Sequence, residues 1–316
     1  MSRFRNVAEL GASSGRPPVA VELSPEGVLA AALPAARSRR SAVAAEKGRV
    51  YAFVPLPPGA LVPNLDEADK PSVRAPEAVA SAIRLALSQV APRTRDVTLV
   101  LPDTLVRVFV LDFDSMPAKA AEAVSVVRFR LRKMVPFDVE PAGVSCQVLT
   151  QNEAECKVLA AVVPGPILAE YEAAVRDAGY EPGAVLSSSL AALEAADATE
   201  GVLAVNLSAR SITTVVTSGQ ELLLYRTLDL PADPELRVME IERSIAVAAA
   251  YFEDKLGAPP RRLYYAGIES FEQFAASIGN PEIAIAAWAE RPEEGALTAL
   301  PQTSFAGVTG ALAGAS

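Results

Sequence analysis

The chain has 316 residues, a formal net charge of −9 and an apolar fraction of 51%. This length allows two ordinary domains or one large one, and the apolar fraction is enough to bury sizeable cores, which excludes global disorder. The acidic balance disfavours general binding to nucleic-acid backbones. No apolar run has the length of a membrane span or the form of a signal peptide, so we expect a cytoplasmic protein.

The sequence contains no histidine and two cysteines, Cys146 and Cys156. Without histidine there is no Ser–His or Cys–His dyad, no imidazole base and no histidine metal ligand. Two cysteines alone do not make a zinc site, so no metal site is predicted. The cysteines flank a predicted hairpin turn, and whether they pair stays open at this level.

In chain order, a loose N-terminal arm at residues 1–17 precedes a three-strand meander. A Pro-rich loop follows, and Pro76 begins a helix because proline is favoured in the first turn. The next predicted elements are strands at 96–103 and 104–113, a helix from Pro117 to Met134, strands at 143–150 and 155–163, a helix ended by Gly179, and a strand leading into a helix over 181–196.

Residues 201–228 repeat the opening pattern as a second three-strand meander. A long helix is predicted over 236–256, since apolar residues recur there at helical spacing. It is followed by a short strand at 261–267, a helix at 270–279 and a closing helix of small residues that can pack tightly on a neighbour.

The two meanders, each continued by alternating helices and strands, indicate a duplicated α/β architecture. We expect a first half over residues 18–200 and a second half over residues 201–301. An inserted helix-and-strand subdomain is expected at about 104–163. The C-terminal helix, residues 302–316, is expected to pack back on the first half.

The most specific stretch, residues 101–149, reads LPDTLVRVFVLDFDSMPAKAAEAVSVVRFRLRKMVPFDVEPAGVSCQVL. Together with the order of the later segments at 167–193, 204–216 and 261–267, it resembles the PilM branch of the actin-like superfamily. This branch is related to FtsA and to the cytoplasmic region of the type II secretion protein GspL. The resemblance covers residues 18–316 and implies an actin-like (ribonuclease H-like) duplicated fold.

In that family, ATP phosphates lie between two β-hairpins, whose small turns and carboxylates hold phosphate, magnesium and water. The first hairpin here departs from the pattern, because the acid is Glu22 and the glycine has become Ser24. Pro25 removes a backbone donor and Glu26 adds a negative charge. Gly27 is retained, and the family's lysine is missing.

The second hairpin has Asn206 in place of the family's carboxylate and Ser208 in place of its glycine. Arg210 could offset phosphate charge and is the one feature that favours nucleotide. The adenosine-side turn keeps only Gly267. The family's lid subdomain is missing, since residues 230–234 alone join the meander to the long helix. We therefore expect degenerate nucleotide motifs, no catalytic residue and no cofactor, with ATP and Mg²⁺ as the alternative.

A basic run on the predicted helix after Pro117 suggests a contact surface, with Arg128, Phe129 and Arg132 as candidates for partner binding. It could contact acidic lipid or an acidic partner segment, or be an ordinary solvated helix face. Two other candidates have simpler interpretations. Asp112 and Asp114 fit strand-end solvation, and the serines at 187–189 fit a helix N-cap.

The resemblance implies a non-catalytic scaffold of a type IV pilus or type II secretion complex, peripheral at the inner membrane through a partner. The expected partner is the N-terminal cytoplasmic tail of a PilN-like or GspL/GspM-like membrane protein, bound within about residues 100–165. Contact with a cytoplasmic motor ATPase and homodimerisation stay open. The alternatives are an ATP-binding or ATP-hydrolysing protein of the same superfamily, or a filament former of the FtsA type.

Overall fold

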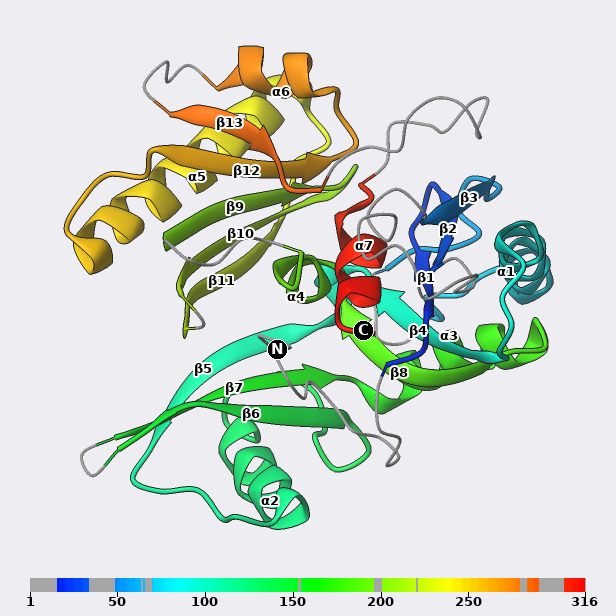
Figure 1. Ribbon diagram of the computed structural model, residues 1–316, viewed down its shortest axis with the longest axis horizontal. Helices are drawn as coiled ribbons and strands as arrows, with labels where there is room; N and C mark the ends of the chain where they lie inside the picture. The colour runs from blue at the N-terminus through cyan, green and yellow to red at the C-terminus, as the bar shows by residue number, and fades with distance from the viewer. Residues whose placement is uncertain are drawn as a thin grey trace, which may run out of the picture.

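The computed structural model describes residues 16–33, 49–63, 65, 70–152, 155–195, 201–219, 221–278, 283–289 and 304–315. The expected arm at 1–17 therefore lies almost entirely outside the described residues. The described chain forms three sheets, which Figure 1 shows as three separate bodies around a central region.

The first sheet has the strand order β3-β2-β1-β4-β8. Its strands are β1 (Val19–Leu23), β2 (Gly27–Ala32), β3 (Val50–Pro55), β4 (Asp96–Leu101) and β8 (Glu181–Ser187). The first three pair antiparallel, and β4 and β8 add in parallel. Strand β1 is apolar on both faces because both faces of the sheet are covered by helices.

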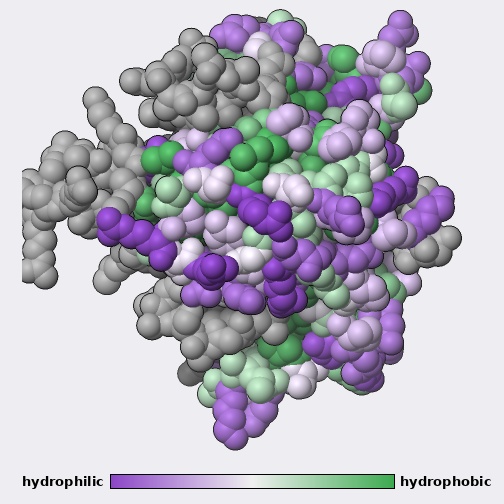
Figure 2. All heavy atoms as spheres, turned by 90° about the vertical axis from the view of Figure 1, so that its right-hand side faces the viewer, coloured by the Kyte–Doolittle hydropathy of each residue, from purple (hydrophilic) through white to green (hydrophobic). Residues whose placement is uncertain are grey.

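The helices that cover this sheet come from distant parts of the chain. Helix α1 (Pro76–Val90) and helix α3 (Gly165–Asp177) pack on the face that carries Val19, Val21 and Leu23. Helix α7 (Ala306–Ala313) packs on the other face, over Ala20 and against α4 (Ser188–Leu193). On the side of the molecule that carries α1, hydrophilic side chains lie interspersed with hydrophobic ones (Figure 2).

Helix α7 approaches α4 closely because its residues are small. A Cβ at Gly310 would overlap the Ala191 carbonyl group, and a Cβ at Gly307 would meet the side chains of Glu22 and Ser188. Glycine at these two positions therefore lets the C-terminal helix lie directly over the first hairpin.

The second sheet repeats the order of the first as β11-β10-β9-β12-β13. Its strands are β9 (Gly201–Leu207), β10 (Ser211–Ser218), β11 (Glu221–Asp229), β12 (Arg262–Gly267) and β13 (Ala284–Ala287). Helix α5 (Pro234–Leu256) covers one face, and α6 (Phe271–Ser277) stacks Phe274 on Tyr265 at 3.7 Å between ring centroids. Residues 230–233 alone connect β11 to α5.

The inserted sheet has the order β5-β7-β6, with β5 (Arg107–Phe113), β6 (Gly143–Gln151) and β7 (Cys156–Val163). Helix α2 (Ala120–Leu131) packs on its outer face through Val127 and Leu131, at the bottom of Figure 1. The opposite face joins the large core of the first half. A single 3₁₀ turn, η1 (Asp103–Leu105), connects β4 to this sheet.

Candidate functional site

A cleft of about 610 Å³ lies where the two halves meet. Both predicted hairpins line it, with Glu22 and Ser24 on one side and Asn206, Ser208 and Arg210 on the other. Gly27 and Gly267 are not among the residues that line it. The volume is that of an ordinary small-molecule site.

The first turn uses its own polar groups to close the hairpin. The Ser24 backbone N–H donates to the Gly27 carbonyl at 3.0 Å, and the Gly27 N–H donates back to the Ser24 carbonyl at 3.2 Å. The Ser24 hydroxyl also bonds the Gly27 carbonyl, at 3.1 Å. Pro25 has no N–H to offer, and Glu26 places a carboxylate at the cleft. Few backbone donors are left in this turn for an anion.

The second turn is likewise satisfied internally. The Ser208 hydroxyl accepts from the backbone N–H of Arg210 at 3.2 Å and from that of Ser211 at 2.9 Å. From helix α5, the Arg237 guanidinium donates to the carbonyls of Ser208 and Ala209, at 2.9 and 2.6 Å. These hydrogen bonds hold the turn in shape.

Gly267 has a packing role in the structure. A Cβ on it would overlap the Tyr265 hydroxyl, which accepts from the Glu269 N–H at 3.1 Å and donates to the Glu269 carbonyl at 3.1 Å. Tyr265 thus fills the turn that follows β12. Ile268, one residue further along, reaches the cleft.

The floor of the cleft is a buried polar cluster centred on Asp103, which is 6% exposed. Its carboxylate accepts the Ser189 N–H at 2.9 Å and the Ser189 hydroxyl. From the second half, the Tyr225 hydroxyl donates to it at 2.8 Å and the Asn206 amide donates at 3.3 Å. One carboxylate from the first half therefore binds donors from both halves.

The Asn206 amide also donates to the hydroxyls of Ser188 and Ser189, at 3.2 and 3.1 Å. An aspartate at this position would offer acceptors only and would bring a second charge against Asp103. The amide therefore matches its surroundings as a donor.

Glu22 lies at the edge of this cluster. Burial raises its pKa from 4.5 to about 8, helped by the charges of Asp103 and Glu26 and offset in part by hydrogen bonds with the Ser188 hydroxyl and the Val308 N–H. Its Oε2 is buried and makes no hydrogen bond of ordinary geometry with any described residue. At neutral pH this carboxyl is largely protonated, which makes it a weak metal ligand.

Asp103 was missed as a site residue by sequence reasoning, although the Leu101-Pro102-Asp103 strand end was recognised. The available signal is an acid two residues after a strand whose last five residues are buried. The serine prediction needs a correction as well. Ser187 occupies the N-cap position of α4, but its side chain makes no capping hydrogen bond, because Asp103 accepts the N–H of Ser189 instead.

No group of three or more histidine, cysteine, aspartate or glutamate side chains that could hold a metal is found in the described part of the chain. Within the same residues, no helix is both long and apolar enough to cross a bilayer. Cys146 and Cys156 are both free, since in the β6–β7 register they face Ala160 and Gln151.

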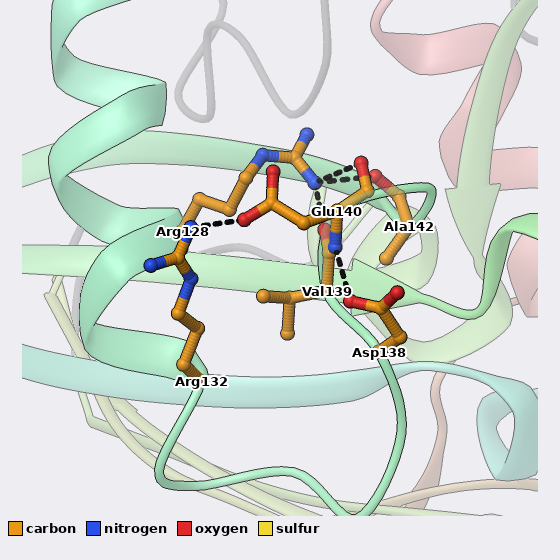
Figure 3. Close-up of polar contacts among 6 residues, drawn as sticks. All are labelled: Arg128, Arg132, Asp138, Val139, Glu140 and Ala142. Carbon is orange, nitrogen blue, oxygen red and sulfur yellow. Dashed lines mark hydrogen bonds and ion pairs between the residues drawn. The ribbon is translucent and has the colours of Figure 1, made fainter.

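Of the predicted contact residues, Arg128 and Phe129 lie on α2 and Arg132 directly follows its last residue. Figure 3 shows the contacts of the two arginines. Arg128 donates to the carbonyls of Val139, Glu140 and Ala142 and so ties the helix to the loop before β6. Arg132 pairs with the Glu140 carboxylate. Phe129 is exposed.

A second, smaller cavity of about 40 Å³ lies between the inserted sheet and the first half. It runs between two edge strands, with residues 143–145 of β6 on one side and residues 185–187 of β8 on the other. Apolar side chains of Leu101, Val106, Leu168 and Leu190 complete its lining. We call it the edge-strand groove.

A chain of the PilM–PilN type IV pilus biogenesis complex matches 95% of this chain over 97% of its own length, with a TM-score of 0.68 and 19% sequence identity. The fold of this chain is PilM-like. The repeated strand order of the two halves and this match confirm the predicted actin-like, duplicated α/β class.

Two other solved structures are more distant. The cytoplasmic domain of EpsL, an inner-membrane component of the type II secretion system of Vibrio cholerae, has a TM-score of 0.49 at 13% identity, covering 93% of this chain and 92% of its own. A Bacteroides thetaiotaomicron protein with an actin-like ATPase fold has a TM-score of 0.44 at 10% identity, covering 85% and 90%. Both TM-scores are below 0.5, so we infer nothing about this chain from these two structures. No protein-family model matches the sequence, and no curated protein matches it significantly.

The raised pKa of Glu22 gives a prediction for stability against pH. Because its folded value of about 8 exceeds the ordinary 4.5, the folded state holds a proton that the unfolded chain releases in that window. Stability should therefore fall as pH rises from about 5 to 8. Glu22→Gln, which keeps the uncharged shape, should flatten this part of the profile and be more stable than wild type at pH 8.5, measured by urea unfolding. Glu253→Gln on α5 is the control, and equal slopes for wild type and Glu22→Gln would contradict the assignment.

Proposed function

We propose that this protein is a non-catalytic cytoplasmic scaffold of a type IV pilus or type II secretion inner-membrane complex. Its role would be to bind the N-terminal cytoplasmic tail of a PilN-like membrane protein and so to sit at the inner membrane. The PilM-like fold supports the assignment to this kind of machinery. The non-catalytic part rests on one observation. In both hairpin turns, backbone and serine hydroxyl groups form hydrogen bonds with one another.

The charges of the cleft support the same proposal. Phosphate binding needs free backbone donors and cations, and hydrolysis needs an ionised carboxylate to position magnesium. Here the cleft presents Glu22 in its protonated form, Glu26 near the first turn and Asp103 already occupied by four donors. An amide stands where the second carboxylate is expected, at Asn206.

A second candidate function, ATP binding, is favoured by one observation. The cleft is large enough for a nucleotide, and Arg107, Arg210 and Arg226 line it. These cations could hold phosphates without supporting hydrolysis.

The tail proposal rests on the edge-strand groove. Strands β6 and β8 are both edges of their sheets, so each has backbone groups free to pair with an added extended segment. The apolar side chains between them suit alternate apolar residues of such a segment. The groove spans part of the range expected from sequence and extends beyond it to residues 168–190.

Isothermal titration with Mg·ATP tests the nucleotide site. We expect no measurable heat of binding up to millimolar ATP, because the turn donors and carboxylates are already used. Binding in the micromolar range would contradict the proposal and favour the second candidate. The same protein sample, titrated with a tail peptide, serves as the control that it is folded and competent.

A synthetic peptide of the N-terminal tail of the PilN-like protein from the same organism tests the groove. We expect micromolar binding to wild type and at least a tenfold loss for Ser145→Trp, because an indole would fill the space between β6 and β8. Val148→Trp, on the same strand but outside the groove, should bind as wild type. Equal binding by Ser145→Trp and wild type would contradict the site, and failure of every such tail would contradict the scaffold function.

A further inference from the structure

The outer face of helix α2 presents a large exposed aromatic ring. Phe129 is 68% exposed and Val126 is 36% exposed. Val126 and Phe129 lie three residues apart on the helix, so they share one face, opposite Val127 and Leu131 in the core of the inserted sheet. Two apolar side chains thus share a face that the inserted sheet does not cover.

The cations of this helix divide into two groups. Arg128 donates hydrogen bonds to three backbone carbonyls. Arg132 forms an ion pair with Glu140, and Lys119 forms one with Glu122 at 3.0 Å. Arg130 and Lys133, in contrast, form no hydrogen bond or ion pair with any residue that the structure describes. Both are exposed next to Phe129.

Lys133 stands four residues after Phe129, in the turn that follows α2, and Arg130 stands four residues after Val126, so each cation lies beside one of the two exposed apolar side chains. The Arg132 guanidinium lies 5.7 Å from the centre of the ring and adds positive potential there. We call Val126, Phe129, Arg130 and Lys133 the α2 patch. None of its residues lines the cleft or the edge-strand groove.

We propose that the α2 patch docks directly on an anionic membrane surface, with Phe129 and Val126 among the lipid headgroups and Arg130 and Lys133 against lipid phosphates. This is the pattern of an interfacial helix, an apolar face bordered by unpaired cations. The patch is the convex side of a helix and not a groove, which suits a flat bilayer better than an extended acidic peptide. The proposal goes beyond tail binding and does not depend on it.

The net charge of −9 does not oppose this contact. At physiological ionic strength, charges are screened beyond about 8 Å, so the unpaired cations of the patch dominate at the bilayer.

Vesicle flotation tests the proposal with the full chain. We expect the protein to float with vesicles of 70% phosphatidylcholine and 30% phosphatidylglycerol and to stay behind with pure phosphatidylcholine. R130E/K133E should lose at least tenfold in apparent affinity, and F129S should lose binding while both cations remain. Because surface electrostatics is screened by salt, 0.5 M NaCl should release the wild type.

A charge-matched control lies on helix α5 at the opposite end of the view in Figure 1. R243E/K255E changes the net charge by the same amount as R130E/K133E and should bind vesicles as wild type does. Insertion of the ring has its own readout. The single native tryptophan, Trp288, is buried, so the emission that F129W shows in excess of wild type comes from position 129. A blue shift of this emission on mixing with anionic vesicles reports insertion of the ring.

Three results would overturn the proposal. These are equal flotation with neutral and anionic vesicles, an equal loss in R243E/K255E and R130E/K133E, and no spectral shift of F129W on anionic vesicles. Binding of a soluble decaglutamate peptide through Arg130 and Lys133 without vesicle binding would instead identify an acidic-peptide site. Thermal unfolding of each variant must match wild type, and F129L, which keeps an apolar side chain, should retain most of the binding lost in F129S.

Discussion

The carboxylate of Asp103 is the interaction on which the arrangement of the two halves depends. It is buried two residues beyond the end of β4 and accepts hydrogen bonds from Ser189 in the first half and from Asn206 and Tyr225 in the second. Burying a carboxylate costs free energy unless hydrogen-bond donors fill its acceptor sites. The donors around Asp103 therefore act together, and the loss of one would weaken the whole cluster. Side chains from both halves therefore meet at this one carboxylate.

The altered phosphate hairpins follow from this constraint. Asn206 is an amide because its neighbour is a carboxylate that needs a donor, and Glu22 keeps a proton because it is buried close to the same charge. Ser208 closes the second turn with its hydroxyl, where a glycine would have left N–H groups free. Each of these departures from the family pattern therefore makes specific contacts of its own in the folded chain.

Much of the fold could be predicted because its signals are local. Pro76 and the spacing of apolar residues gave helix α1 its observed bounds, and the repeated meander gave the duplication. Strand β13, four residues paired on one side only, was missed because so short a run carries no clear periodicity. The hairpins of the cleft were placed correctly, but the role of Asp103 was not found, since it depends on partners 86 to 122 residues away in sequence. In the same way, helical spacing cannot tell that Arg128 is occupied by carbonyls of the loop before β6 while Arg130 is free among the described residues.

The most direct test of this account is the unfolding free energy of Asp103→Asn in the absence of nucleotide, measured in urea. The amide would turn a donor toward the Asn206 amide and lose charge-assisted hydrogen bonds, so we predict a loss of about 2–3 kcal/mol relative to wild type. Asp112→Asn, at an exposed position of β5, should stay within about 0.5 kcal/mol. If Asp103→Asn is as stable as Asp112→Asn, the two halves are not held together by this carboxylate and the central claim is wrong.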